Sequence, residues 1–194
     1  MPGTTPSTVD SASLSRLEET LWVMQARQGD VAAFARLLTR FERPILYYLN
    51  RCLGDPGAAL EANQQVWLDA YRGLPRLASP EAFRVWLYRI ARAQAARAQR
   101  AAIVDRERLV PLDEHDVPAD EGTDGETAET AAEVHHALAQ LHASHREVLT
   151  LHYLQDLTLE EMAAALDRPV GTMKSRLFEA RRALRRVLKD TRHE

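Results

Sequence analysis

The chain has 194 residues, of which 45% are hydrophobic and 6% aromatic, and it carries 25 Lys and Arg against 28 Asp and Glu. This length suits one ordinary domain or two small ones, which argues against a large enzyme with separate cofactor and substrate domains. The single cysteine, Cys52, cannot form an intramolecular disulfide, no apolar run approaches the ~20 residues of a membrane span, and the first residues lack a signal-peptide pattern. We therefore expect a cytoplasmic protein without membrane insertion.

Helical signals begin close to the start of the chain. Residues 1–14 are rich in Ser, Thr and Pro, which predicts a disordered start. Ser15 and Glu18 then have the spacing of a capping box, which predicts a helix that stops at Gly29. Asp30 can cap the next helix.

The helical pattern continues to about residue 108. Pro44 is expected to begin a third helix, which ends at the turn that starts with Gly54. A fourth helix is expected at about 58–72, and Ser79 can cap a fifth that becomes rich in Ala and Arg through Arg100. Because no segment alternates convincingly between apolar and polar residues, the predicted fold class is all-α.

Charge is strongly segregated along the chain. Residues 109–133 contain nine acidic residues and no Lys or Arg, which predicts a flexible acidic linker between a helical domain at 15–108 and a second one at 134–194. The stretch Arg84–Arg108 has a net charge of +5 and the stretch Arg168–Arg192 a net charge of +7. Such basic stretches are typical of proteins that neutralise phosphates. The acidic linker could lie against both stretches and hold the two modules together.

The second module has the pattern of a helix-turn-helix. Capping boxes that start at Ser144 and Thr158 each open a short helix. The second of these, at about 159–166, is followed by a turn and by a long helix from near Val170 to Lys189. Polar side chains that can enter a major groove lie at the start of this long helix: Thr172, Lys174, Ser175 and Arg176. The alternative interpretation is a solvated basic helix face.

The sequence offers no catalytic apparatus. Five histidines fall between His135 and His152, but the cap at Ser144 interrupts any continuous helix and no cysteine joins them, so solvated positions are favoured over a metal site. Cys52 has no histidine nearby in the sequence to activate it. Nucleotide-binding and hydrolase motifs are missing as well. We expect no enzyme activity, metal or cofactor.

Two segments together resemble a known family. The stretches "QQVWLDAYRGL" at Gln64–Leu74 and "FRVWLYRIAR" at Phe83–Arg92 resemble the promoter-binding domain of bacterial sigma factors. The stretch His145–Arg186 resembles their C-terminal helix-turn-helix domain. Two small helical domains and a short linker match the extracytoplasmic-function subgroup.

The resemblance implies a dissociable subunit that binds the RNA polymerase core and directs promoter recognition and transcription initiation, with an anti-sigma factor as a further candidate partner. It implies a polymerase-binding surface at Glu61, Gln64, Gln65, Trp67, Leu68 and Asp69. It implies contacts to the downstream element and the separated strand from Arg72, Arg76, Arg84, Arg89, Arg92, Arg97 and Arg100. It implies that Thr172, Lys174, Ser175 and Arg176 contact the upstream element as duplex, with Arg181 and Arg182 on phosphates.

The sequence also departs from the family pattern. The family usually carries an acidic residue after a glutamine where Gln65 stands, and a polar Asn and an acid where Ala93 and Ala96 stand. These departures leave open an adaptor derived from a sigma factor that cannot open promoters. A freestanding helix-turn-helix regulator that binds DNA without polymerase is a second alternative. Asp167 replaces the glycine usual in the turn, and Asp tolerates the left-handed backbone conformation.

Overall fold

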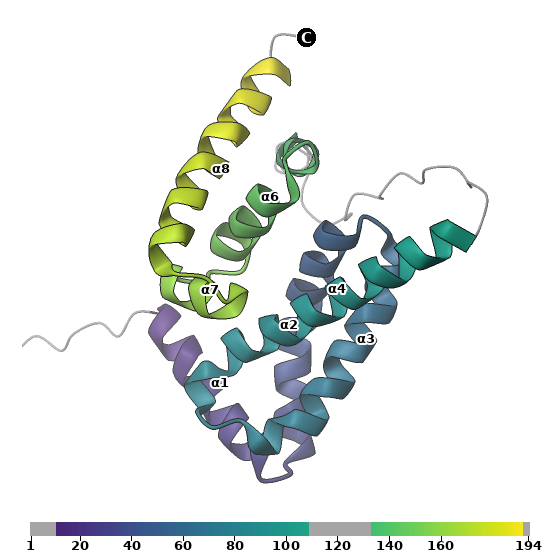
Figure 1. The fold of residues 1–194 in the computed structure, drawn as a ribbon. Helices are drawn as coiled ribbons and strands as arrows, with labels where there is room; N and C mark the ends of the chain where they lie inside the picture. Colours follow the sequence, from purple (N-terminus) through teal and green to yellow (C-terminus); the bar gives the residue numbers. More distant parts are fainter. Residues whose placement is uncertain (1–10, 109–132, 192–194) are drawn as a thin grey trace, which may run out of the picture.

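The computed structural model describes residues 11–108 and 133–191, and both ranges are helical with no strand (Figure 1). The N-terminal module consists of α1 (Ser11–Arg27), α2 (Val31–Leu53), α3 (Pro56–Gly73) and α4 (Phe83–Arg108), with short 3-10 turns η1 (Leu74–Arg76) and η2 (Pro80–Ala82) before α4. The C-terminal module contains a helical segment at 133–139, then α6 (Ala143–Leu149), the π-helical turn η3 (Thr150–Leu154), α7 (Leu159–Leu166) and α8 (Val170–Thr191). The all-α prediction is confirmed.

The first helix begins earlier than its capping signal predicts. α1 already includes Ser11, so residues 11–14 are helical and the predicted disordered start is corrected there; residues 1–10 lie outside the described ranges. Ser15 is not a cap, because its hydroxyl accepts a hydrogen bond from Arg40 on α2 at 3.2 Å. Asp30 does cap α2, with Oδ1 accepting the backbone N–H groups of Ala32 and Ala33 at 2.8 and 3.1 Å.

The predicted break at Pro44 is wrong. α2 runs through Pro44 as one helix of 23 residues to the left-handed Gly54. Proline inside a helix costs about 3 kcal/mol because one backbone hydrogen bond is lost and the ring crowds the preceding turn. An uninterrupted buried stripe on both sides of Pro44 offsets that cost: Leu37, Phe41, Ile45, Tyr48 and Leu49.

The core of the N-terminal module lies where α2, α3 and α4 meet. Val66 of α3 and Leu87 of α4 are fully buried, as are Leu37, Ile45 and Leu49 of α2. Burying one such aliphatic side chain contributes about 1.5–3 kcal/mol, so these contacts dominate the stability of the module.

The C-terminal module contains one predicted cap and lacks the other. His142, not Ser144, caps α6, and its Nδ1 accepts the backbone N–H of Ser144 at 3.3 Å, so the predicted capping box at Ser144 is wrong. At Thr158 the box is complete: Thr158 Oγ1 accepts from Glu161 N at 3.1 Å and Glu161 Oε2 accepts from Thr158 N at 2.8 Å. Asp167 ends α7 in the left-handed conformation (φ 52°, ψ 56°), as its sequence position predicts.

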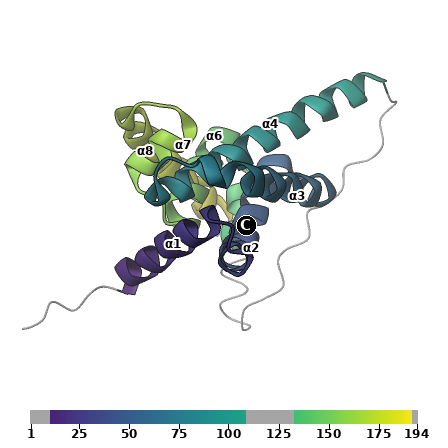
Figure 2. The ribbon, with the colours of Figure 1, turned by 90° about the horizontal axis from the view of Figure 1, so that it is seen from below.

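The two modules pack against each other, with α7 beside α4 and α6 beside α2 (Figure 1; Figure 2). Two tyrosines of the N-terminal module donate across this contact. The buried Tyr48 hydroxyl donates to Glu147 Oε1 at 2.9 Å, and the buried Tyr88 hydroxyl donates to Gln155 Oε1. Helices therefore make this contact directly. The acidic linker that we expected to mediate it falls almost entirely outside the described ranges.

Candidate nucleic-acid interface

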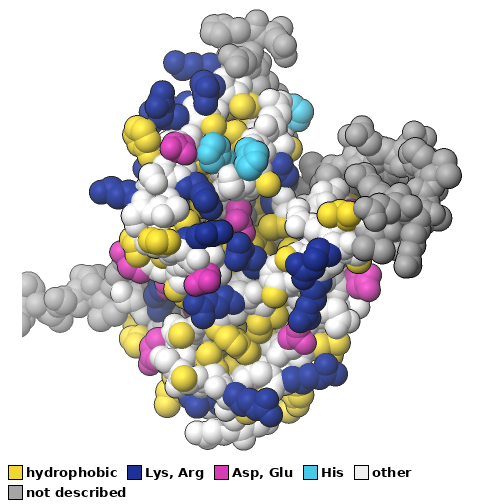
Figure 3. Space-filling model, in the orientation of Figure 1, with side chains coloured by type: hydrophobic (Ala, Val, Ile, Leu, Met, Phe, Trp, Pro, Cys, Tyr) yellow, Lys and Arg dark blue, Asp and Glu magenta, His cyan; other side chains and the backbone are white. Residues whose placement is uncertain are grey.

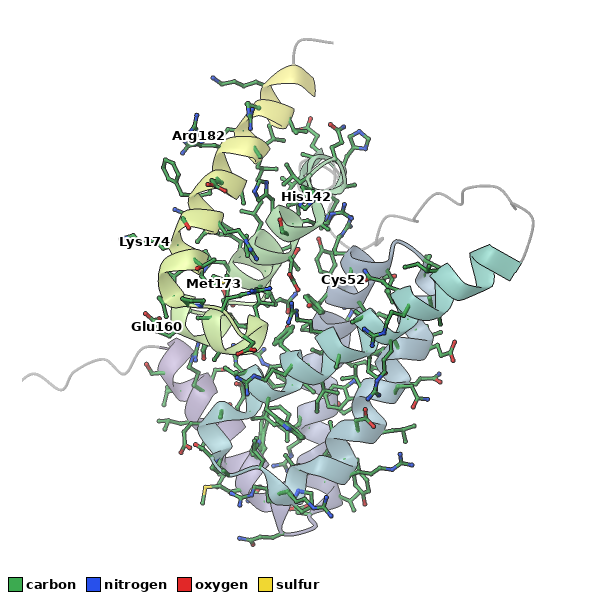
Figure 4. All side chains as sticks on the ribbon, viewed as in Figure 1. Cys52, His142, Glu160, Met173, Lys174 and Arg182 are labelled. Atoms are coloured by element: carbon green, nitrogen blue, oxygen red, sulfur yellow. The ribbon has the colours of Figure 1, made fainter. Side chains whose placement is uncertain are left out.

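The long helix α8 holds its first turns on the module through one apolar face. Met173, Leu177 and Ala180 are buried. Lys174 and Ser175 lie on the opposite face and are exposed, and Figure 4 shows Lys174 and Arg182 projecting away from α6. The Ser175 hydroxyl bonds back to the carbonyl groups of Gly171 and Thr172 at 3.2 and 3.1 Å. The start of α8 therefore presents polar and basic side chains on a rigid, solvent-facing edge.

Thr172 and Arg176 lie on a different side of α8. Both are half-buried, and Arg176 lines a cavity between the two modules. In this conformation the predicted set of four polar residues is thus divided: Lys174 and Ser175 face solvent, and Arg176 faces the N-terminal module.

Two exposed aromatic side chains extend this basic surface, and neither was among the residues singled out from the sequence. Phe178 is 61% exposed and lies 6.0 Å from the guanidinium of Arg182, while Tyr153 is 52% exposed and lies 5.3 Å from that of Arg181. The position of Phe178, four residues after Lys174, was the signal that could have found it.

Arg84, the first arginine of α4, is engaged inside the N-terminal module. Its Nε and Nη2 donate to the two carboxylate oxygens of Glu19, both at 2.7 Å, and Arg40 adds a third bond at 3.3 Å. The Glu19 side chain is only 7% exposed. Burial acts to lower the pKa of Arg84, but the hydrogen bonds and charge of Glu19 outweigh it and raise that pKa. In this conformation Arg84 holds α1 to α4, so its predicted contact with a DNA strand stays a prediction that would require this pair to open.

The next two arginines of α4 contact the C-terminal module. Arg89 Nε donates to the carbonyl oxygen of Ala164 at 2.8 Å, and Arg92 Nη1 donates to that of Leu166 at 3.3 Å. Arg92 Nε also lies 3.6 Å from Glu147 Oε1. Both carbonyl groups belong to the last turn of α7, where the helix dipole favours a cation. The C-terminal module therefore covers part of the basic face of α4.

The remaining predicted arginines stay accessible. Arg100 is exposed, and Arg97 is exposed with its Nη1 3.9 Å from Asp69 of its own module. Arg72, in the last turn of α3, and Arg76, in η1, are also exposed. All four are accessible in the described conformation.

The polymerase-binding residues predicted on α3 include both exposed and buried side chains. Glu61, Gln64, Gln65 and Leu68 are exposed. Trp67 is only 7% exposed and packs edge-on against Phe34, with ring centroids 6.0 Å apart, so in this conformation it supports the surface from beneath.

Asp69, the sixth residue of that set, is partly buried. Its Oδ2 accepts a hydrogen bond from Gln94 of α4 at 2.6 Å. Two exposed apolar side chains of α3, not singled out from the sequence, lie near these residues: Leu60 is 51% exposed and Tyr71 is 58% exposed.

The described residues show no metal-binding cluster. Residues 11–108 and 133–191 contain no group of three or more His, Cys, Asp or Glu side chains that could hold a metal ion. Cys52 is a free, half-buried thiol, and burial together with the charge of Glu147 raises its pKa to about 12. A thiol with such a pKa is a poor nucleophile at neutral pH. Within the same ranges, no helix combines the length and apolar character needed to cross a membrane.

Comparison with known proteins decides the family. The family model for Sigma-70 region 2 matches residues 37–102, and that for Sigma-70 region 4 matches residues 131–184. RNA polymerase sigma-H factor of Pseudomonas aeruginosa is 31% identical over 191 residues, which cover 90% of this chain and 96% of the relative. The chain belongs to the extracytoplasmic-function sigma factors. The corresponding sigma-E factor of Escherichia coli K12 is 29% identical over 87% of this chain and 93% of its own.

Solved structures share the fold of this sigma factor. CnrH in complex with the cytosolic domain of CnrY has a TM-score of 0.64 at 22% identity, covering 89% of this chain and 98% of CnrH. The sigma factor RpoE in complex with the anti-sigma factor NepR from Bartonella quintana has a TM-score of 0.64 at 23% identity, covering 82% of this chain and 98% of RpoE.

As a sigma factor, the protein binds the RNA polymerase core and directs promoter recognition and transcription initiation; it is not an enzyme. Region 2 spans most of α2 through α4, and region 4 spans the helix-turn-helix. A freestanding regulator would not account for the match to region 2, so that alternative is set aside.

Proposed function

We propose that the outer face of α8 contacts the upstream promoter element as duplex DNA. Lys174 and Ser175 would contact bases from this face, Arg176 would join them with Thr172 once it leaves the cavity between the modules, and Arg181 and Arg182 would contact phosphates. The exposed polar edge at the start of α8, opposite its buried Met173, is the observation that carries this assignment. A helix with this arrangement can enter a major groove by its N-terminal residues.

The downstream element and the separated strand are assigned to the end of α3, to η1 and to α4. Arg72 of α3, Arg76 of η1, and Arg97 and Arg100 of α4 are exposed and free to approach a DNA backbone. Arg89 and Arg92 would join this surface only when their bonds to α7 break. DNA contacts by Arg89 and Arg92 therefore require α4 to lose its contacts with α7.

The polymerase core is assigned to the exposed face of α3. Gln64, Gln65 and Glu61 supply polar contacts there, and Leu60, Leu68 and Tyr71 supply apolar area. An aromatic and aliphatic surface of this kind, bordered by polar residues, is typical of a protein interface. Because two solved relatives are complexes with CnrY and with the anti-sigma factor NepR, an anti-sigma factor is the further proposed partner. We propose that the protein acts in the cytoplasm.

Reconstitution with bacterial RNA polymerase core tests the whole assignment. Run-off transcripts and permanganate-reactive thymines on genomic promoter fragments are the expected result. Polymerase binding without thymine reactivity would indicate an adaptor that cannot open promoters. The departures from the family pattern at Gln65, Ala93 and Ala96 are the reason to test this alternative.

Two substitutions on α8 separate base contacts from phosphate contacts. Arg176→Ala should weaken holoenzyme binding to particular upstream sequences by about 1–3 kcal/mol. Arg182→Ala should weaken binding to all sequences and reduce the slope of log affinity against log salt concentration by about one. Arg36→Ala, an exposed position on α2, is the matched control. Equal losses for both α8 variants on every sequence would show that the assigned edge of α8 is wrong.

A further inference from the structure

A cavity of about 880 Å³ lies between the two modules. Its walls come from the end of α2, the middle of α4, the start of α6 and the turn between α7 and α8. Cys52 and His142, labelled in Figure 4, line two of these walls. The volume falls within the roughly 300–1,000 Å³ of sites that bind small ligands.

Positive charge dominates the lining of this cavity. Four guanidinium groups line it, against two carboxylates: Arg51, Arg89, Arg92 and Arg176 against Glu147 and Asp167. Glu147 is already occupied, because it accepts the Tyr48 hydroxyl and lies 3.6 Å from Arg92. Figure 3 shows Lys and Arg side chains between the two modules. The cavity therefore carries a surplus of positive charge that suits an anion.

Two buried polar atoms at the cavity lack partners. Thr150 is completely buried, and its Oγ1 has no hydrogen-bond partner within the described residues. Arg51 Nε is likewise buried and without a hydrogen-bond partner there. Both atoms lie beneath the cavity surface, and five other buried side-chain atoms of the described residues also lack a partner, so these two do not identify a ligand.

Small apolar side chains line part of the cavity. Ala93 and Ala96 of α4 line it together with Ala143 and Ala165 from the other module. These small side chains leave room for a planar ring. Ala93 and Ala96 also stand where the family usually carries Asn and an acid, so this chain lacks a carboxylate that would repel an anion. No DNA or polymerase contact assigned above uses these two alanines.

We propose that this cavity binds a nucleoside polyphosphate, and that the bound nucleotide holds the two modules together. The phosphates would bind Arg51, and would bind Arg89 and Arg92 through the guanidinium N–H groups that do not donate to Ala164 and Leu166, because guanidinium groups form paired hydrogen bonds with phosphate oxygens. The base would lie against the alanine side chains that line the cavity. Binding is a property of the free chain and does not depend on the proposed promoter contacts. Only the consequence of binding depends on those contacts, because a nucleotide on Arg89 and Arg92 would compete with the promoter strand.

Calorimetric titration of the full chain, without polymerase or DNA, tests this binding. ATP and GTP are the probes, adenosine tests the base alone and inorganic tripolyphosphate tests the phosphates alone. Nucleotide should bind more tightly than tripolyphosphate, and adenosine should not bind measurably. Absence of ATP and GTP binding at millimolar concentration would overturn the proposal, and equal affinity for tripolyphosphate would reduce the site to a general anion site and overturn its nucleotide assignment.

A pair of variants on α4 locates the site. Ala93→Glu adds a carboxylate to the cavity wall and should weaken nucleotide binding about tenfold or more, the effect of placing like charges in contact. Ala101→Glu makes the same change at an exposed position of α4 outside the cavity and should leave affinity within about twofold, as expected for a screened surface charge. Equal affinity of the two variants would overturn the proposed location.

Alkylation of Cys52 gives a second measurement that does not depend on a variant. Cys52 lines the cavity, so saturating ATP should slow its reaction with iodoacetamide about fivefold or more by restricting access. Nucleotide bound to the basic face of α8 would leave the rate unchanged, and that result would also overturn the assignment.

Discussion

Glu19 is a buried carboxylate that two arginines satisfy, and it should be among the most sensitive single positions of the N-terminal module. Glu19→Ala leaves Arg84, with a side chain only 13% exposed, without its partner. Breaking a buried ion pair in this way costs about 3–5 kcal/mol of the free energy of unfolding. Urea denaturation of the full chain measures this loss.

The neighbouring Glu18 supplies the control for that measurement, because it is exposed on the same helix. Glu18→Ala should change the free energy of unfolding by no more than about 0.5 kcal/mol. If Glu19→Ala costs no more than Glu18→Ala, Arg84 is not held by Glu19 and could contact DNA after all.

At the scale of residues, the sequence predicted the exposure of those candidate site residues whose orientation follows from the helical period of their own helix. Lys174 and Ser175 face solvent because Met173 and Leu177 occupy the buried stripe of α8, which periodicity alone predicts. The role of Arg84 could not be found this way. Its partner Glu19 lies 65 residues away on another helix, and a pattern along one helix carries no information about such a contact.

At the scale of elements, the end of α3 packs tightly on α4. A Cβ atom added to Gly73 would come within 2.8 Å of Trp86, closer than real contacts allow. Gly73→Ala should therefore lower the free energy of unfolding by about 1–3 kcal/mol, the range for overpacking. It should also displace the nearby Arg72 and Arg76. Thermal unfolding measures the first effect.

Gly171, in the first turn of α8, gives the opposite expectation. An added Cβ there has no heavy atom within 4 Å. Gly171→Ala should thus stabilise the chain by about 0.4–1 kcal/mol, because alanine restricts the unfolded state and favours the helix. A Gly73→Ala variant as stable as Gly171→Ala would mean that α3 and α4 do not pack as described.

The helices themselves were largely predictable, and their boundaries less so. Thr158 and Ser144 have the same capping spacing, but only Thr158 acts as a cap. His142 takes the N-cap position, so Ser144 lies inside α6, and the Glu147 carboxylate accepts the Tyr48 hydroxyl of the other module. Pro44 failed as a boundary for a similar reason: burial of the stripe around it outweighs its local cost. In both cases packing overrides a local signal.

At the scale of the whole molecule, the described conformation places the function of α4 in conflict with its packing. Arg89 and Arg92 belong to the basic surface proposed for the promoter strand, yet both bind the last turn of α7. These contacts are few and partly exposed, and exposed ionic contacts contribute little. Polymerase and DNA can displace these two contacts at modest energetic cost, but separating the modules also breaks the buried hydrogen bonds from Tyr48 to Glu147 and from Tyr88 to Gln155.

Cys52 can report that separation without any added label. It is the only cysteine of the chain and lines the cavity between the modules, where burial and the charge of Glu147 raise its pKa to about 12 from 9.0. A rise of this size lowers the thiolate fraction at neutral pH by about three orders of magnitude. Arg89→Ala combined with Arg92→Ala should weaken the contact between α4 and α7 and thereby increase the rate of iodoacetamide alkylation.

The direction of the change distinguishes opening from a local electrostatic effect. The positive charge of Arg92 lowers the pKa of Cys52, so removing it from a closed chain would slow alkylation. A faster reaction can therefore arise only if the thiol becomes more accessible. Arg97→Ala combined with Arg100→Ala removes equal charge from exposed positions of α4 and should leave the rate near that of the unmodified chain. Slower alkylation of the variant that combines Arg89→Ala with Arg92→Ala would show that the modules stay together without these two arginines.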